Sequence, residues 1–121
     1  MASVRYLVDD VDRAVAFYTG SLGFTLERRF GPAMAIVRRD DFSLWLAGPI
    51  SSAARAMPDG RKPAPGGWNR IVVQVADLAG MVRKLREQAV PFRNDIIDGP
   101  GGWQILCEDP AGNVVELFEP R

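Results

Sequence analysis

The chain offers few side chains that could do acid–base, nucleophilic or metal chemistry, and it contains no histidine. This absence argues against serine–histidine or cysteine–histidine catalysis and against imidazole metal ligation within these residues. The single cysteine, Cys107, stands in the apolar run 105–107, which favours a packed small hydrophobe over a nucleophile. It also permits no internal disulfide.

Glu116 is the carboxylate with the most unusual surroundings. Its neighbours Val114, Val115, Leu117 and Phe118 are apolar on both faces of a strand, which predicts a central place in a sheet. An ionised carboxylate in such a place needs a compensating partner. Glu116 is therefore the candidate general base, if the protein is an enzyme.

Composition limits the classes of partner. With 121 residues, 47% of them hydrophobic, the chain has the size of one domain with its own core. Fifteen basic residues balance fifteen acidic ones, which argues against nucleic acid as a partner. No apolar run approaches a membrane span and no secretory signal is evident, so we expect no membrane partner and a cytoplasmic location.

Apolar periodicity predicts a β-α-β-β-β order in the first half. The expected elements are a strand at 3–8, a helix capped by Asp10, and strands at 24–30, 33–38 and 42–47. Gly20 and Gly23 are candidate helix stops, and residues 39–41 form a candidate hairpin turn.

The second half repeats this order. Its expected elements are a strand at 70–75, a helix capped by Asp77, and strands at 92–97, 103–108 and 114–118. We therefore expect one domain, 1–121, made of a first module at 1–48, a linker at 49–67 and a second module at 68–121. The linker is rich in proline and glycine, and it is either a plain connector or a lid.

Three motifs together resemble the vicinal oxygen chelate superfamily, the group of glyoxalases, bleomycin-resistance proteins and extradiol dioxygenases. They are DVDRAVAFY at 10–18, LGF at 22–24 and DPAGNVVELF at 109–118. The resemblance covers essentially the whole chain. It implies an α+β fold in which two tandem β-α-β-β-β modules form a curved mixed sheet around a cup. It also implies a small-molecule ligand and a homodimer.

The resemblance further implies four inward positions that hold a metal ion in metal-dependent members. Here they carry Ser3, Trp45, Arg70 and Glu116. Only Glu116 is a competent ligand, because tryptophan and arginine donate no lone pair and a lone serine hydroxyl binds metals poorly. We expect no metal and no other cofactor, which disfavours glyoxalase I and extradiol dioxygenase activity.

Two interpretations of Arg70 and Glu116 remain open. In one they form a structural ion pair; in the other Glu116 is a general base and Arg70 stabilises a ligand oxyanion. The tryptophans either fill the core and a dimer interface or form stacking walls for an aromatic ligand. The candidate ligand-binding residues are Ser3, Arg5, Trp45, Trp68, Gln74 and Trp103.

The favoured function is a metal-free binding module for a small, possibly aromatic molecule. The alternative is a metal-independent isomerase, lyase or cyclase that uses Glu116 and Arg70. A metalloenzyme with unusual ligands is the least favoured. Asn113 is expected to stabilise the 109–113 turn only.

Overall fold

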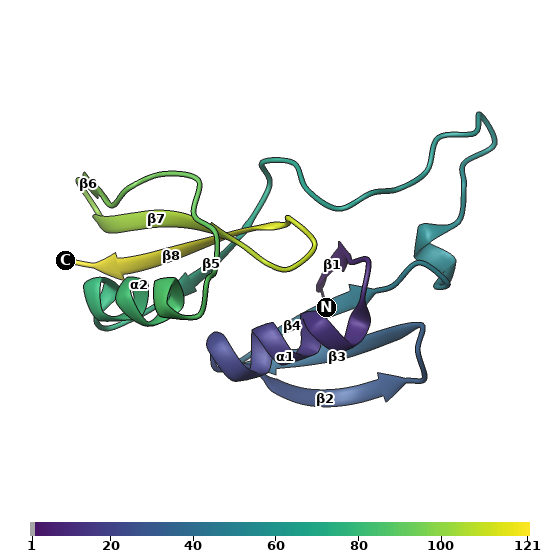
Figure 1. Ribbon diagram of the computed structural model, residues 1–121, viewed down its shortest axis with the longest axis horizontal. Coiled ribbons are helices and arrows are strands. Elements are labelled where there is room, and N and C mark those ends of the chain that lie inside the picture. Colours follow the sequence, from purple (N-terminus) through teal and green to yellow (C-terminus); the bar gives the residue numbers. More distant parts are fainter. Residues whose placement is uncertain (1) are drawn as a thin grey trace. The chain divides into compact units, whose positions relative to one another are not determined.

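The computed structural model describes residues 2–121, which form two compact units (Figure 1). One unit ends at Gly66 and the other begins at Gly67. The elements of the first are β1 (Val4–Leu7), α1 (Val11–Ser21), β2 (Thr25–Phe30), β3 (Met34–Arg39), β4 (Phe42–Ala47) and the short 3-10 helix η1 (Ser52–Ala54). Those of the second are β5 (Ile71–Gln74), α2 (Leu78–Glu87), β6 (Ile97–Gly99), β7 (Gly102–Glu108) and β8 (Val114–Pro120).

The first unit is a four-stranded sheet in the order β1-β4-β3-β2, with α1 on one face (Figure 1). Strands β1 and β4 are parallel, and the other neighbours are antiparallel. Alternate residues of β3 and β4 face the helix and are fully buried: Ala35, Val37, Leu44 and Leu46. Val11, Ala14, Phe17 and Tyr18 of α1 supply the other half of this core. On the opposite face of the sheet, Ile36 and Trp45 are only partly buried.

The second unit repeats this architecture, with the order β5-β8-β7-β6 and a parallel β5–β8 pair. Helix α2 packs against β8, and its stripe Leu78, Val82 and Leu85 is buried. The duplicated β-α-β-β-β order predicted from the sequence is confirmed. The central position of the strand that carries Glu116 is confirmed as well.

Both helix caps follow the prediction. The side chain of Asp10 accepts a hydrogen bond from the Arg13 amide at 3.1 Å, and that of Asp77 accepts one from the Gly80 amide at 3.0 Å. After α1 the chain turns at Gly23, whose φ of 75° suits glycine. The two helices therefore begin at equivalent places in the two units.

The predicted strand at 92–97 is wrong over most of its length. Phe92 makes only an isolated bridge with Cys107, and β6 begins at Ile97. The Oδ1 atom of Asn94 accepts a hydrogen bond from the Leu106 amide at 2.9 Å. A side chain thus takes the place of a backbone carbonyl beside β7, and the regular ladder is interrupted there.

Residues 48–70 contain η1 but no strand. The finer division into modules at 1–48 and 68–121 with a linker at 49–67 stays our proposal. No helix within residues 2–121 is long and apolar enough to cross a membrane.

Candidate functional site

The face of the first sheet opposite α1 carries a row of four residues, one from each strand. The register pairs Arg5 with Trp45, Trp45 with Ile36, and Ile36 with Arg28. Since side chains alternate along a strand, these four lie on the side away from the buried Leu44 and its neighbours. We call this side the first open face. It presents an apolar centre with an arginine at each end.

A pocket of about 290 Å³ lies at the β1 end of this row, lined by Ser3, Val4, Arg5 and Trp45. The Arg5 guanidinium carbon is 5.0 Å from the centroid of the Trp45 ring, within the range of a cation–π interaction. Trp45 is half-buried, whereas Ser3 and Arg5 are exposed. The structure thus brings together three of the residues predicted to bind a ligand.

A second pocket of the first unit, about 410 Å³, lies between the end of β1 and the segment that follows β4. Its lining includes Asp9, Pro49, Lys62 and Pro65. It has no aromatic side chain and none of the predicted ligand-binding residues. The smaller pocket at Trp45 is therefore the better candidate for recognition of an aromatic molecule.

In the second unit Arg70 and Glu116 form the ion pair predicted from the sequence. The Arg70 Nε atom donates to Glu116 Oε1 at 3.1 Å. Glu116 is only 8% exposed, while the Arg70 side chain is 34% exposed. The pairing compensates a carboxylate that would otherwise be buried alone. A catalytic role for either residue stays a prediction.

The register separates two other predicted site residues. Gln74 is paired with Phe118, two positions beyond Glu116 on β8, so it lies on the same face as Glu116. Trp103 is paired with Glu119, which lies an odd number of positions beyond Glu116 on β8. Trp103 therefore lies on the opposite face, toward α2. The second sheet cannot present Trp103 and Glu116 on one face.

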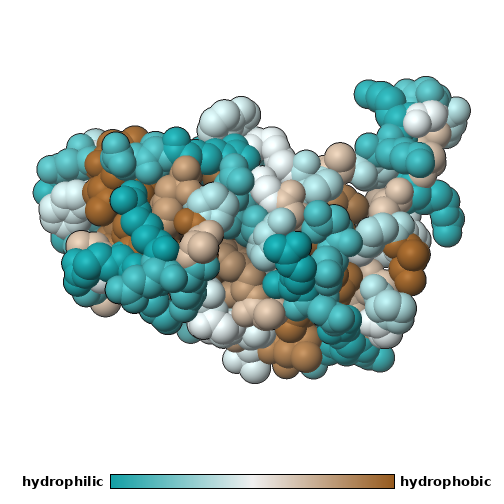
Figure 2. Space-filling model, viewed as in Figure 1, coloured by the Kyte–Doolittle hydropathy of each residue, from teal (hydrophilic) through white to brown (hydrophobic). Residues whose placement is uncertain are grey.

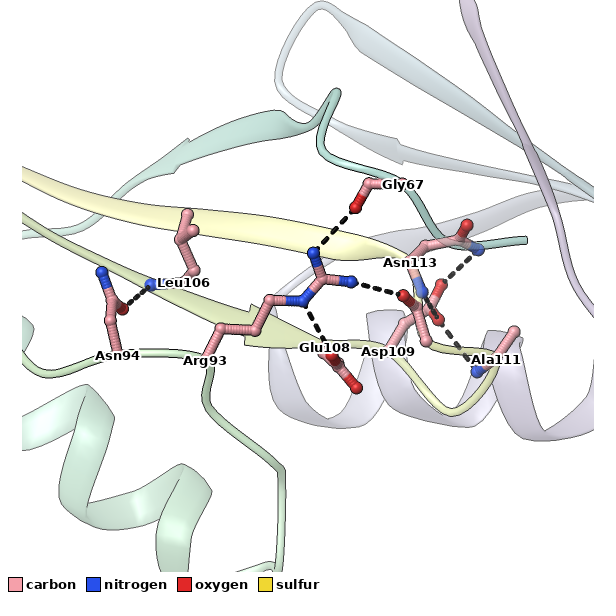
Figure 3. Close-up of polar contacts among 9 residues, drawn as sticks. Gly67, Arg93, Asn94, Leu106, Glu108, Asp109, Ala111 and Asn113 are labelled. Carbon is pink, nitrogen blue, oxygen red and sulfur yellow. Dashed lines mark hydrogen bonds and ion pairs between the residues drawn. The ribbon is translucent and has the colours of Figure 1, made fainter.

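Trp68 packs against Arg93, a residue that no sequence pattern singles out. Figure 3 shows the polar contacts of Arg93. The Arg93 guanidinium carbon is 4.6 Å from the Trp68 ring centroid, and Nε donates to Glu108 Oε2 at 2.7 Å. Its other two nitrogens donate to the carbonyl oxygens of Gly67 at 2.7 Å and Gly112 at 3.1 Å. No local motif distinguishes Arg93 from the other arginines, because its partners are distant in sequence.

The turn before β8 is held by Asp109, which is 2% exposed. Its carboxylate accepts hydrogen bonds from the amides of Ala111 and Asn113, both at 2.9 Å, and from Asn113 Nδ2 at 3.0 Å (Figure 3). Gly112 has a φ of 88°. The structural interpretation of Asn113 is therefore confirmed.

Cys107 is buried as predicted, and its burial raises the pKa of the thiol to about 12. The thiol is therefore protonated near neutral pH, when a nucleophilic cysteine needs its thiolate. The carboxylates of Asp109 and Glu108 add smaller effects in the same direction. Cys107 is a core residue.

The residues at the four positions of the implied metal site do not fit a divalent cation. Trp45 and Arg70 offer no lone pair to a metal, and the one carboxylate, Glu116, accepts a hydrogen bond from Arg70. Within residues 2–121, no group of three or more histidine, cysteine, aspartate or glutamate side chains is arranged to hold a metal ion.

Two repeated β-α-β-β-β modules, each a four-stranded sheet with one helix, define the class of this fold. The chain belongs to the glyoxalase/bleomycin resistance protein/dioxygenase superfamily, whose family model matches residues 1–117. None of the curated proteins matches the sequence.

Solved structures share this fold. A superfamily member from Sphaerobacter thermophilus is 26% identical, with a TM-score of 0.75 over 98% of this chain and 96% of that one. TnmS3, an antibiotic binding protein from Streptomyces sp., is 24% identical, with a TM-score of 0.70 over 100% and 97%. A lactoylglutathione lyase from Agrobacterium tumefaciens is 22% identical, with a TM-score of 0.73 over 98% and 92%.

Proposed function

We propose that this protein binds a small aromatic molecule at Trp45 and does so without a metal ion. The observation that carries the proposal is the pocket in which Trp45 and Arg5 lie together. A half-buried indole at the wall of a pocket offers a flat apolar surface for stacking, with polar groups beside it to orient a ligand. That TnmS3 is an antibiotic binding protein with this fold supports a binding function.

The donor set supports the metal-free part of the proposal. A site that keeps Glu116 in an ion pair with Arg70 offers a cation a single, already compensated carboxylate. Metal analysis of the purified protein tests this point. We expect no stoichiometric transition metal, and a bound metal required for binding would contradict it.

The test of the binding site uses 2-naphthamide, a neutral planar probe, and the three indole N–H signals in an NMR spectrum. Single tryptophan substitutions assign the signals. We expect the probe to shift the Trp45 signal, and Trp45→Leu to weaken binding about tenfold or more.

The matched control is Phe30→Leu. Phe30 is another aromatic residue with an arginine over its ring, since the guanidinium carbon of Arg28 lies 4.7 Å from its centroid. It lies outside the pocket, so its substitution should leave the affinity unchanged. If the probe leaves the Trp45 signal unmoved, the proposed binding site is wrong.

One observation favours a second function, a metal-independent isomerase, lyase or cyclase. A buried carboxylate, Glu116, lies beside the guanidinium of Arg70, which is partly open to solvent. In this proposal Glu116 removes a proton from an activated carbonyl compound and Arg70 holds the resulting oxyanion. Gln74, on the same face, would offer an amide to a polar ligand edge.

A homodimer, which the family resemblance implies, is also a proposal. The first sheet ends at β2, whose Leu26 and Phe30 are 44% and 41% exposed. Figure 2 shows hydrophobic side chains at the surface among hydrophilic ones. Exposed edge strands of this kind favour association. Light scattering should give twice the chain mass, and a monomer at micromolar concentration would contradict the proposal.

A further inference from the structure

Each of the three tryptophans carries an arginine over its ring. The guanidinium carbons of Arg5, Arg93 and Arg121 lie 5.0, 4.6 and 4.6 Å from the ring centroids of Trp45, Trp68 and Trp103. Packing of a guanidinium on an indole is thus a repeated feature of this chain. By itself it does not distinguish a ligand site.

The pairs differ in what else the arginine binds. Arg93 donates to the carboxylate of Glu108, and Arg121 donates to that of Asp98. Within residues 2–121 no carboxylate forms an ion pair with Arg5. The pair that lines a pocket is therefore the pair whose positive charge lacks an anion.

The surroundings of Arg5 reinforce this difference. In β1–β4 the only acidic residue is Glu27, and it pairs with Arg38 at 2.8 Å. Arg28, on the first open face, lies over Phe30 and has no ion pair among the described residues. A ligand on this face would therefore lie on the apolar side chains of Trp45 and Ile36, next to arginines that have no carboxylate partner among the described residues.

We infer that the aromatic ligand carries a carboxylate or a similar planar anionic group, which Arg5 binds while the ring contacts Trp45. This inference rests on the proposed function. A planar guanidinium that lies against an indole keeps its N–H edge available, and that edge matches both oxygens of a carboxylate. The Ser3 hydroxyl, in the same pocket, offers a further hydrogen bond.

The experiment compares 2-naphthoate with 2-naphthamide, which share a ring system and differ in charge. Binding is measured by calorimetry and by the Trp45 indole signal, in the wild type and in Arg5→Gln. We expect 2-naphthoate to bind the wild type about tenfold more tightly. Arg5→Gln should remove this preference, so that the two probes bind the variant with similar affinity.

Arg28→Gln is the matched control, because Arg28 lies on the same face over an aromatic ring but outside the pocket. It should keep the preference for the anion. If both probes bind at Trp45 with equal affinity, this inference is overturned and the proposed function stands. If neither binds there, the proposed function fails. A preference that survives Arg5→Gln also overturns the inference, and an accompanying loss in Arg28→Gln would place the anion at Arg28.

Discussion

The strands of the first sheet carry five arginines and one glutamate, whereas those of the second carry four acidic residues and no basic one. The formal net charge of the chain is zero, so composition conceals this difference. The two sheets share one topology and opposite electrostatics. Duplication of a fold therefore did not duplicate its surface chemistry.

The two sheets also differ in how their charges are compensated. In the second, Asp98, Glu108 and Glu116 pair with Arg121, Arg93 and Arg70, and Glu119 accepts the Leu78 amide at 2.8 Å. In the first, Arg29 and Arg38 pair with Asp12 and Glu27, whereas Arg5 and Arg28 contact aromatic rings. The acidic side chains of the second sheet are thus compensated within their own unit, which leaves the first sheet as the better place for an anionic ligand.

The largest expected effect concerns Cys107, which is buried in the second unit near the carboxylates of Glu108 and Asp109. Its raised pKa, about 12 against an ordinary 9.0, lowers the thiolate population about a thousandfold at pH 8. Because the thiol is both protonated and buried, we expect Ellman's reagent to label the native protein on the order of a hundredfold more slowly than the unfolded chain. Rapid labelling would show that the second unit opens readily and would weaken the comparison.

The same shift predicts a dependence of stability on pH. The unfolded thiol ionises near pH 9, before the folded one, so its contribution to the free energy of unfolding is present below that pH. It is lost as the pH rises toward about 12. Urea unfolding of the wild type and of Cys107→Ala should show a steeper decline for the wild type in this range. Parallel curves would contradict the assignment.

Arg93→Met tests whether the paired arginines are structural. The substitution removes an ion pair and two hydrogen bonds to carbonyls and leaves Glu108, 29% exposed, without its partner. We expect a loss of about 3 kcal/mol in the free energy of unfolding, measured in urea.

Arg5→Met is the matched control, since Arg5 is also an arginine stacked on a tryptophan. Its loss should change stability by less than about 0.5 kcal/mol, as for other exposed side chains. Equal losses in the two variants would mean that Arg5 is structural too. The contrast between the two sheets would then fail.

Much of the fold could be predicted because its signals are local. The caps Asp10 and Asp77 contact amides three residues away, and the helical stripes follow a fixed period. The error at 92–97 could not be avoided in this way, because the Asn94 side chain, and not a backbone carbonyl, accepts the hydrogen bond from the Leu106 amide on β7. The periodicity of apolar residues does not show where a side chain replaces a backbone carbonyl as hydrogen-bond acceptor.

The candidate site was predictable to a smaller extent. The pair of Arg70 and Glu116 could be expected because a carboxylate in an apolar strand needs compensation. The face on which Trp103 lies depends on the β7–β8 register, which the length of the intervening turn sets. Arg93 depends on contacts across sequence separations of 15 to 26 residues, which no local pattern encodes.

Glu116→Gln should have a smaller effect than Arg93→Met, and it tests whether the Glu116 carboxylate is structural, as that of Glu108 is. Glutamine keeps an oxygen that can accept from Arg70 Nε but lacks the charge, so a loss of about 1 kcal/mol in the free energy of unfolding is expected. Glu108→Gln is the matched control, because Glu108 is a partly buried carboxylate paired with another arginine.

Exchange of the α-protons of 2-tetralone in D2O separates the structural role of Glu116 from a catalytic one. If Glu116 is compensated in the same way as Glu108, the wild type and both variants should exchange the ketone no faster than buffer. Faster exchange in the wild type and in Glu108→Gln, abolished in Glu116→Gln, would instead identify Glu116 as a general base. Arg70 would then compensate the resting carboxylate and hold the enolate oxygen during the reaction. The catalytic residues would then lie on the second sheet, and the ion pair of Arg70 with Glu116 would be present only before substrate binds.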